Sequence, residues 1–388
     1  MNICFLMKYF RIGGICVVTS VLAQKFIENG HNVIVVTFNE PKSDMRKRLN
    51  PSVPLYALNG LLCSNANITA LRDVLKRHRI HVVINQWGLP FLPVLVLKRA
   101  SQNINIKIIS VYHTIPNANN RLKKIEYLRA NNKNLVLKLV LSGLWFAFRL
   151  VTGLSMRYVY RQSDVYLLLS QSYLSVFKNF IFASDVPKVR ILPNPVTIGN
   201  SDYQCESGKE KEILYVGRLD CFAKRVDRII GTWALLEKEY PDWKLTIIGD
   251  GPDKGRLQAQ ANKLGLKQIS FEGYRHPKPY YERASILMLT SEFEGFPLVL
   301  TECMSFGVIP VVYGSFSSVY DIIQDNTDGI IIPYSSKKYN SIEAADRLRS
   351  IMDNRDCRNK MSRAAMQTSK RYSLDYIGKM WEELFMLE

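Results

Sequence analysis

The sequence lacks most features that would indicate a disulfide-linked, metal-binding or exported protein. Its seven cysteines are widely spaced and form no Cys-x-x-Cys pair, and it contains no Asp-x-Asp motif. Such cysteine usage is typical of a reducing compartment without a structural zinc site. The first residues also lack the basic start and the small-residue cleavage site of a signal peptide. We therefore expect a cytoplasmic protein without a metal, in which the apolar run 2–7 is a first strand.

Acidic residues are scarce in the first half of the chain. Residues 1–200 hold 26 Lys and Arg against 7 Asp and Glu, a net of +19, and the other 26 basic and 27 acidic residues leave the second half at −1. The whole basic excess behind the formal charge of +18 therefore lies in the first half. Such a field implies a polyanionic partner, which is a nucleic acid, an anionic membrane leaflet or a phosphate-bearing substrate.

Short apolar runs alternate with helical or loop stretches along most of the chain. At 388 residues the chain is too long for one ordinary core and suits two domains. The expected strands form two series, which are 2–7, 31–37, 81–85, 107–113, 164–170 and 189–193 and then 213–216, 244–248, 269–271, 286–289, 308–312 and 329–332. This alternation predicts an α/β fold with two doubly wound, mostly parallel sheets.

A change of composition separates the two series. Residues 193–202 are rich in turn-forming types, and 206–212 are polar and charged. We expect an N-terminal Rossmann-like domain over 1–195, a linker over 196–211 and a C-terminal Rossmann-like domain over 212–372. The last segment, 373–388, is expected to contain an amphipathic helix that crosses back to the first domain.

One apolar segment indicates contact with a membrane. Residues 135–154 are mostly Leu, Val, Phe and Trp and are long enough to span a bilayer, but Lys138 and Arg149 interrupt them. Basic residues flank the segment on both sides. An apolar stretch with such flanks is typical of an element that lies on an anionic leaflet, and a buried core helix is the alternative. The charge of the first half favours the membrane surface.

Two turns that follow expected strands carry groups suited to phosphate. Gly13 and Gly14 follow the first strand, where a phosphate or sugar could approach the backbone, although a tight turn alone would also need glycine. Arg218 and Lys224 follow the strand 213–216 and could place two cations on one diphosphate. A salt bridge within the loop would explain either of these two cations alone.

The segment 290–302 combines a strand end, a Gly-Phe-Pro turn and a helix start. Pro297 suits the first turn of a helix, because its missing N–H has no intrahelical partner there. Glu294 precedes this helix and Glu302 lies inside it. A helix start of this kind presents free amides and a positive dipole end to a phosphate.

These motifs resemble those of the GT-B retaining glycosyltransferases of family 4, also called glycosyl transferases group 1, of the bacterial surface-polysaccharide type. The resemblance rests on Gly217-Arg-Leu with Lys224, on Gly249-Asp-Gly-Pro, and on 294–302 and 307–312, in matching order and spacing. It is tight from 213 to 334 and loose from 40 to 160. It implies two Rossmann-like domains that face a central cleft.

The resemblance implies roles for the residues of the second domain. Arg218 and Lys224 would hold the donor diphosphate, helped by the amides at Phe296 and Leu298, since Pro297 stands where many relatives have glycine and supplies no amide. Arg225 likewise replaces a common glycine. Glu302 would accept hydrogen bonds from the ribose, with Gly249 and Gly251 beside the nucleoside, although both glycines could also be turn residues only.

The catalytic residues implied by the resemblance are Glu294, which would contact the donor sugar, and His113, which would lie in the cleft. A histidine at a strand end can also do no more than bond a loop. Gly13 and Gly14 would form the glycine loop of the cleft. The diphosphate would be stabilised by two cations and helix amides, so that no metal and no cofactor are expected.

The sequence therefore predicts a metal-independent retaining hexosyltransferase. It would move a hexose or N-acetylhexosamine from a nucleotide-diphosphate sugar, with UDP favoured over GDP, to a saccharide or lipid-linked saccharide in polysaccharide biosynthesis. Its partners would be the nucleotide-sugar donor, a saccharide or glycolipid acceptor and the anionic inner face of the cell membrane, and no nucleic acid.

Two alternatives remain open. A sugar-nucleotide epimerase or hydrolase of the same fold would turn over donor without acceptor. A basic nucleic-acid-binding protein would explain the charge but would leave the pairs Glu294 and Glu302, and Arg218 and Lys224, without a purpose.

Overall fold

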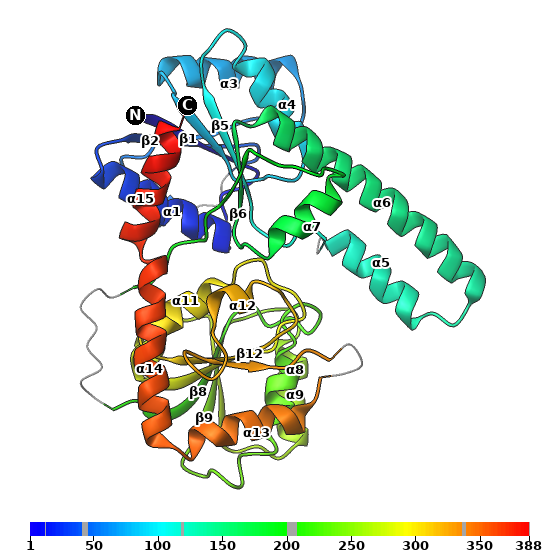
Figure 1. Cartoon of the computed structure of the whole chain (residues 1–388), viewed down its shortest axis with the longest axis vertical. Coiled ribbons are helices and arrows are strands. Elements are labelled where there is room, and N and C mark those ends of the chain that lie inside the picture. The colour runs from blue at the N-terminus through cyan, green and yellow to red at the C-terminus, as the bar shows by residue number, and fades with distance from the viewer. Residues whose placement is uncertain (12, 41–45, 118–119, 200–207, 336–338, 388) are drawn as a thin grey trace. The chain divides into compact units, whose positions relative to one another are not determined.

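The chain divides into two compact units (Figure 1). The computed structural model describes all residues except 12, 41–45, 118–119, 200–207, 336–338 and 388. Unit 1 comprises Met1–Asn194 and Ile377–Glu388, and unit 2 comprises Pro195–Tyr376. Much of the linker expected over 196–211 falls on 200–207 and so lies outside the described residues.

Unit 1 is built on a seven-stranded parallel sheet in the order β3-β2-β1-β4-β5-β6-β7. The long strands read as near-continuous apolar runs because both faces of a parallel sheet are covered. The strand β3 is not among the expected ones, since it has only three residues, Leu-Tyr-Ala, directly after Pro54. The strands are β1 (Asn2–Met7), β2 (Asn32–Thr37), β3 (Leu55–Ala57), β4 (Val82–Asn85), β5 (Lys107–Tyr112), β6 (Val165–Leu168) and β7 (Val189–Ile191).

Two helices of unit 1 begin at a side-chain cap. The Ser64 hydroxyl accepts a hydrogen bond from the Asn67 amide at 3.2 Å and so caps α3. Asn134 caps α6 in the same way, through the Leu137 amide at 3.2 Å. The helices are α1 (Gly14–Glu28), α3 (Asn65–Arg77), α4 (Phe91–Ala100), α5 (Asn120–Asn131), α6 (Leu135–Gln162) and α7 (Tyr173–Phe180).

Unit 2 is built on a six-stranded parallel sheet in the order β10-β9-β8-β11-β12-β13. The α/β fold with two parallel sheets confirms the predicted fold class. The strands are β8 (Glu210–Val216), β9 (Lys244–Ile248), β10 (Ile269–Gly273), β11 (Ala284–Leu289), β12 (Ile309–Tyr313) and β13 (Ile330–Ile332). The helices are α8 (Val226–Trp233), α9 (Lys254–Lys263), α10 (Lys278–Arg283), α11 (Leu298–Ser305), α12 (Val319–Ile322), α13 (Ser341–Met352) and α14 (Arg355–Ser369), followed by the 3₁₀ turn η1 (Lys370–Tyr372).

The C-terminal helix α15 (Leu374–Met386) packs on the first unit. The rings of Trp381 and Phe385 lie 6.0 and 5.2 Å from the ring of Phe26 on α1. The Glu382 carboxylate contacts His31 Nε2 at 2.8 Å. The buried aromatic side chains of α15 therefore complete the core of unit 1.

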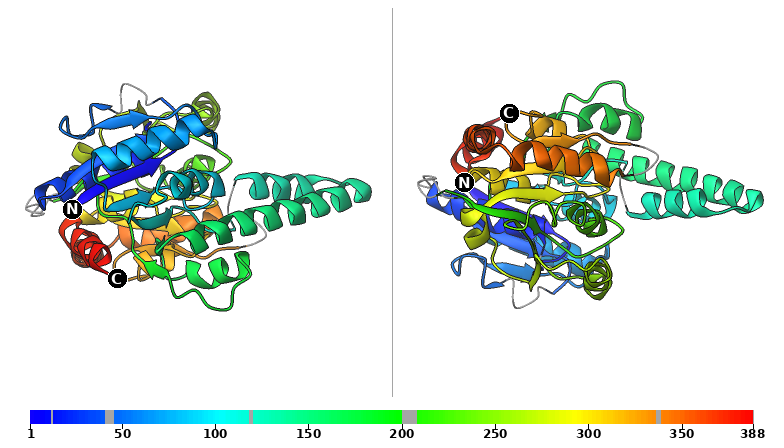
Figure 2. Two further views of the ribbon diagram at one scale, coloured as in Figure 1. Left: turned by 90° about the horizontal axis from the view of Figure 1, so that it is seen from above. Right: turned by 90° about the horizontal axis from the view of Figure 1, so that it is seen from below.

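Helices α5 and α6 pack against each other and project from the rest of unit 1 as an antiparallel hairpin (Figures 1 and 2). We call residues 120–162 the α5–α6 hairpin. The most apolar 18-residue window of α6 has a mean hydropathy of 1.8, and none of its residues is buried. The alternative of a buried core helix is therefore excluded. Only the C-terminal part of α6 enters the core, through Gly153, Met156 and Val159.

Candidate functional site

The loop after β8 is organised around Asp220. Its Oδ1 accepts hydrogen bonds from the amides of Phe222 at 2.8 Å and Ala223 at 2.9 Å. Its carbonyl oxygen accepts from the amides of Lys224 and Arg225, both at 3.0 Å. These four bonds fold the loop into a tight turn, which fixes the backbone that carries the two cations expected to bind phosphate.

The two cations of this loop have different partners. The Arg218 guanidinium pairs with Asp220 Oδ2 at 2.5 Å and keeps a side chain that is 60% exposed. Lys224 Nζ instead contacts Glu294 Oε1 at 2.6 Å, with side chains only 26% and 11% exposed. The structure thus brings together the expected phosphate-binding lysine and the expected sugar-contacting carboxylate, and it leaves Arg218 open to solvent.

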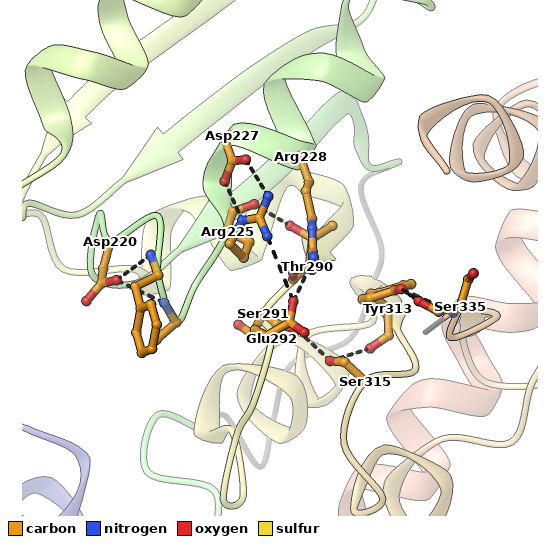
Figure 3. Close-up of polar contacts among 12 residues, drawn as sticks. Asp220, Arg225, Asp227, Arg228, Thr290, Ser291, Glu292, Tyr313, Ser315 and Ser335 are labelled. Carbon is orange, nitrogen blue, oxygen red and sulfur yellow. Dashed lines mark hydrogen bonds and ion pairs between the residues drawn. The ribbon is translucent and has the colours of Figure 1, made fainter. Parts of the chain in front are cut away.

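A second charged network joins the start of α8 to the end of β11 (Figure 3). Arg225 forms a bidentate ion pair with Asp227, through Nε at 3.0 Å and Nη2 at 2.9 Å. Arg228 Nη2 contacts Glu292 Oε2 at 2.6 Å, and Arg228 Nη1 donates to the Thr290 carbonyl at 3.1 Å. Thr290 Oγ1 donates in turn to the Arg225 carbonyl at 2.9 Å. These bonds hold the segments 217–228 and 290–294 together.

Sequence reasoning missed this second network, although one signal for it was present. Arg225 adopts left-handed backbone angles, with φ 51° and ψ 43°, a conformation that favours glycine. Arg225 was noted as a departure from the family's glycine, and Asp227 stands two residues later. The hydrogen bonds between their side chains help to offset the cost of that backbone.

The helix start expected at Pro297 is present. Pro297 is the N-cap of α11 with φ −71° and ψ 107°, so the helix begins one residue later, at Leu298. The Phe296 side chain is buried and its ring lies 5.6 Å from that of Tyr372, which anchors the turn. Helix geometry leaves the amides of the first turn without intrahelical carbonyl partners, so the Leu298 amide is available to an anion.

Glu302 lies one turn further along α11 and is only 5% exposed. One carboxylate oxygen accepts from the Thr197 hydroxyl, and the other accepts from the Tyr281 hydroxyl at 3.1 Å. Burial raises the pKa of this carboxyl, and both hydrogen bonds act against that rise. The structure places Glu302 as a buried acceptor that already holds two donors, and its role toward a ribose stays a prediction.

Gly249 and Gly251 lie where two backbone segments pass very close together. A Cβ atom on Gly249 would lie 1.8 Å from the Gly217 carbonyl oxygen, and one on Gly251 would lie 2.3 Å from the Leu219 carbonyl oxygen. The amides of Gly217 and Leu219 donate to Ile248 and Asp250 across the same contact, at 3.0 and 2.9 Å. Both glycines are thus required by packing, and their contact with a nucleoside stays a prediction.

We expect Gly249→Ala to destabilise the protein by about 3 kcal/mol, because overpacking and a left-handed backbone each cost about 1 to 2 kcal/mol. Gly249 has φ +140°, and the new methyl group would meet the backbone of Gly217. Urea unfolding would measure the change. The matched control is Gly255→Ala in α9, where a Cβ meets nothing within 4 Å. Equal stability of the two variants would show that the loop contact is not as tight as described.

In unit 1, His113 follows β5 and bonds Gln86, which follows β4. The distance from His113 Nε2 to Gln86 Oε1 is 2.5 Å. Burial lowers the pKa of His113 to about 4, so the ring is neutral near pH 7. Because the carboxamide oxygen can only accept, Nε2 carries the proton and Nδ1 is the acceptor. Gln86 also lines a cavity of about 430 Å³ together with Gly13 and Gly14. The structure thus connects His113 with the glycine loop through Gln86.

The lowered pKa of His113 predicts a loss of stability toward acid. His113 binds a proton near pH 6.5 in the unfolded chain and only near pH 4 in the folded chain. The contribution of its neutral ring to the free energy of unfolding is therefore complete above pH 6.5 and falls as the pH drops toward 4. The loss reaches at most about 3.5 kcal/mol, at about 1.4 kcal/mol per pKa unit. The free energy of unfolding, measured with urea at several pH values between 4 and 7, should depend less steeply on pH in His113→Asn than in the wild type. His276→Asn, at an exposed site, should keep the wild-type slope, and identical slopes for all three proteins would contradict the assignment.

No group of three or more His, Cys, Asp or Glu side chains that could hold a metal ion occurs in the part of the chain that the structure describes. Independence from metal therefore stays a prediction.

Comparison with known proteins assigns both halves of the chain. Residues 12–199 match the profile of Glycosyltransferase Family 4, and residues 203–368 match that of Glycosyl transferases group 1. The solved structure of HepE from Anabaena in complex with UDP matches with a TM-score of 0.73 at 14% identity, over 99% of both chains. At that identity the likeness shows the fold alone, which is GT-B.

Curated relatives match a smaller part of the sequence. A Campylobacter jejuni α-1,4-N-acetyl-D-galactosaminyltransferase, named for a PP-undecaprenol-linked saccharide, is 28% identical over 201 residues, which cover 51% of this chain and 55% of that protein. An exopolysaccharide phosphotransferase of Streptomyces coelicolor is 31% identical over 203 residues, which cover 51% of this chain and 21% of that protein. The chain thus spans about half or less of the length of these relatives. The two family matches together run from residue 12 to residue 368, and the chain therefore belongs to the glycosyltransferases of group 1, family 4.

Proposed function

We propose that the protein is a retaining glycosyltransferase that moves a hexose or N-acetylhexosamine from a UDP-sugar to a saccharide or lipid-linked saccharide. The observation that carries this proposal is the contact between Lys224 and Glu294, at 2.6 Å, beside the start of α11. It brings together the cation that we propose for phosphate and the carboxylate that we propose for sugar hydroxyls. The UDP bound to the similar structure from Anabaena supports the choice of nucleotide, and the Campylobacter relative supports the acceptor class.

The arrangement fits the electrostatic demand of the reaction. Departure of the diphosphate leaves negative charge on its oxygens, and preorganised donors lower the free energy of that transition state. Lys224, the exposed guanidinium of Arg218 and the first amides of α11 are such donors. Glu294 also accepts a hydrogen bond from Ser291 Oγ at 2.6 Å, so its carboxylate is oriented before a sugar binds.

The decisive experiment is a donor screen by thermal shift, followed by a hydrolysis and transfer assay, with UDP-, GDP- and ADP-sugars. We expect UDP-sugars to stabilise the wild type most and Glu302→Ala to lose most of that stabilisation. If no nucleotide stabilises the wild type, or the variant is stabilised equally, the donor site is assigned wrongly. Turnover of donor that never needs an acceptor would favour the epimerase or hydrolase alternative.

Two further measurements test the stereochemistry of the transfer and its independence from metal. NMR of the product should show the anomeric configuration of the donor, and an inverted product would contradict retention. Activity should survive EDTA, whereas loss with EDTA and recovery with magnesium or manganese would contradict independence from metal.

The membrane part of the proposal depends on how residues are arranged around α6. Lys138 and Arg149, the two charges that interrupt the apolar segment, lie with Ser142, Trp145 and Thr152 on a half-buried stripe. Every exposed position from 135 to 154 is apolar, and these are Leu135, Val136, Leu137, Leu139, Val140, Gly143, Leu144, Phe146, Ala147, Leu150, Val151 and Leu154. We call these twelve residues the outer face of α6.

An uninterrupted apolar face of this size is costly in water and marks an interaction surface. The α5–α6 hairpin holds nine Lys and Arg residues and one acidic residue, Glu126. This charge selects an anionic surface, and a bilayer with anionic lipids supplies both the apolar and the charged partner. We therefore propose that the outer face of α6 enters the cytoplasmic leaflet of the cell membrane and makes the protein a peripheral membrane protein.

The hairpin is expected to lie flat rather than to cross the bilayer. The outer face is about 30 Å long, at about 1.5 Å per residue, which alone would match the hydrocarbon core. However, α5 runs beside α6 and exposes Arg121, Lys124 and Arg129, and charges in the hydrocarbon core are expensive. Lying flat immerses the apolar face and keeps these charges near the lipid headgroups.

A further inference from the structure

The cavity of about 430 Å³ in unit 1 carries positive charge, and the described residues that line it include no carboxylate. It lies where β1 and β4 end and α1 begins, and Gly13 and Gly14 form part of its wall. Its other lining residues include Lys8, Tyr9, Arg11, Gln86 and Trp87, and none is acidic. A cavity that offers two cations and no carboxylate favours an anionic ligand.

Aromatic rings hold these two cations. Lys8 Nζ lies 4.6 Å from the centre of the Tyr9 ring and 4.8 Å from that of Trp87, and Arg11 Cζ lies 4.4 Å from the Tyr9 ring. Such contacts orient a cation without neutralising it. Neither Lys8 nor Arg11 forms an ion pair with any residue that the structure describes. Their charge therefore remains available to a ligand.

A third group in the wall lacks a hydrogen-bond partner. Gln86 is 2% exposed, and its Oε1 accepts from His113, but its Nε2 has no acceptor in the described part of the chain. A buried donor without a partner is unfavourable, and a ligand oxygen would satisfy it. The 15-residue helix α1 also starts here, with no acidic residue in its first turn and no side-chain cap. The amides at its start therefore also favour a ligand that accepts hydrogen bonds.

We propose that this cavity binds an acceptor sugar that carries a carboxylate or phosphate, and that Lys8, Arg11 and Trp87 determine this specificity. The two cations and the Gln86 amide donate to the anionic group, while the Trp87 ring provides apolar surface for the sugar. The proposal rests on the proposed transferase function and narrows its acceptor from saccharides in general to acidic saccharides.

Binding of simple probes to the full chain tests this proposal without knowledge of the complete acceptor. The probes are methyl α-glucoside, methyl α-glucuronoside, glucose 6-phosphate and inorganic phosphate, measured by calorimetry with and without saturating UDP. We expect the two acidic sugars to bind about tenfold or more tighter than the neutral one, since one charge-assisted hydrogen bond gives about that factor.

Variants separate the contributions of charge and ring. Lys8→Met with Arg11→Gln should remove the preference for the acidic sugars, and Trp87→Leu should weaken all three sugars but not inorganic phosphate. Lys98→Met on α4 makes the same change of charge outside the cavity and should bind like the wild type. Thermal unfolding of each variant establishes that it is folded.

Several results would overturn the proposal. These are equal binding of neutral and acidic sugars, an unchanged preference in Lys8→Met with Arg11→Gln, and no binding of any probe. Weaker stabilisation by a UDP-sugar in that double variant, with acidic sugars unaffected, would instead assign the cavity to the donor. Stabilisation of the wild type by UDP distinguishes failure of the proposed transferase function from failure of the acceptor inference. If UDP binds and acidic sugars do not, only the acceptor inference fails.

Discussion

Replacing Lys224 by Met is expected to lower kcat/KM for sugar transfer by about a hundred- to a thousandfold, the effect of removing one preorganised transition-state donor. Lys224 Nζ contacts Glu294 Oε1 at 2.6 Å, so the substitution also leaves a carboxylate that is only 11% exposed without its cation. That charge, no longer balanced by Lys224, would lie next to the anionic diphosphate and repel it. Steady-state kinetics with a UDP-sugar would measure the change.

A double-mutant cycle tests whether Lys224 and Glu294 act as a pair. If they do, Lys224→Met, Glu294→Gln and the double variant should lose similar activity, because each single change already breaks the same unit. Lys211→Met is the matched control, since Lys211 lies on β8 and pairs with Asp242 at an exposed site. Losses that multiply in the double variant would show independent roles. A Lys211→Met variant as impaired as Lys224→Met would show that the loss of activity is not specific to the position of Lys224.

The positions of the strands follow from the chemistry of buried parallel strands, which is why twelve of the thirteen strands that the structure describes could be predicted. Segments such as Val82–Asn85 and Ala284–Leu289 are buried throughout and mostly apolar because both faces of a parallel sheet are covered. The exception, Leu55–Ala57, lies at a sheet edge and forms hydrogen bonds on one side only. Its three residues, Leu-Tyr-Ala, are only partly buried or exposed, and so short a run did not indicate a strand.

The pairings within the site could not be predicted from the sequence. Lys224 and Glu294 are 70 residues apart, and which of several carboxylates faces a cation depends on how two loops fold against each other. Arg218 and Lys224 were expected to share one diphosphate, but the structure gives Arg218 the neighbouring Asp220 and gives Lys224 the distant Glu294. Local spacing suggested these residues, and packing decided their partners.

Packing also accounts for features that spacing cannot distinguish. The glycines at 249 and 251 are compatible with either a ligand or a tight turn, and only the approach of the Gly217 and Leu219 carbonyl oxygens supplies a reason. In the same way, the apolar segment 135–154 is compatible with a core helix or a membrane surface. The position of Lys138 and Arg149 on the half-buried stripe of α6 depends on α5 and on the rest of unit 1.

Leu139→Asp with Phe146→Asp is expected to reduce binding to anionic liposomes by about a hundredfold or more. These side chains are 67% and 62% exposed on the outer face of α6, and burying each in a leaflet contributes about 1.5 to 3 kcal/mol. The two new carboxylates would also be repelled by anionic lipids. Flotation with vesicles that contain phosphatidylglycerol would measure the partition coefficient.

The basic residues of the hairpin should have a smaller and salt-dependent effect. Lys124→Gln with Arg129→Gln should weaken binding by about thirtyfold at low salt, at about 1 kcal/mol for each charge, and by less as salt screens the surface. Because the outer face is apolar, binding of the wild type should fall with salt but should not vanish.

The control must separate loss of membrane contact from loss of folding. Leu62→Asp with Ile342→Asp changes two apolar side chains that are 62% and 64% exposed and do not belong to the hairpin, and it should leave vesicle binding intact. Both double variants should unfold at the wild-type temperature, since exposed side chains contribute little to the core. If the hairpin variant floats with vesicles like the wild type, or if the wild type fails to bind them at low salt, the outer face of α6 is not a membrane surface. A hairpin variant that stays bound but converts from a dimer to a monomer would assign this face to a second copy of the chain instead.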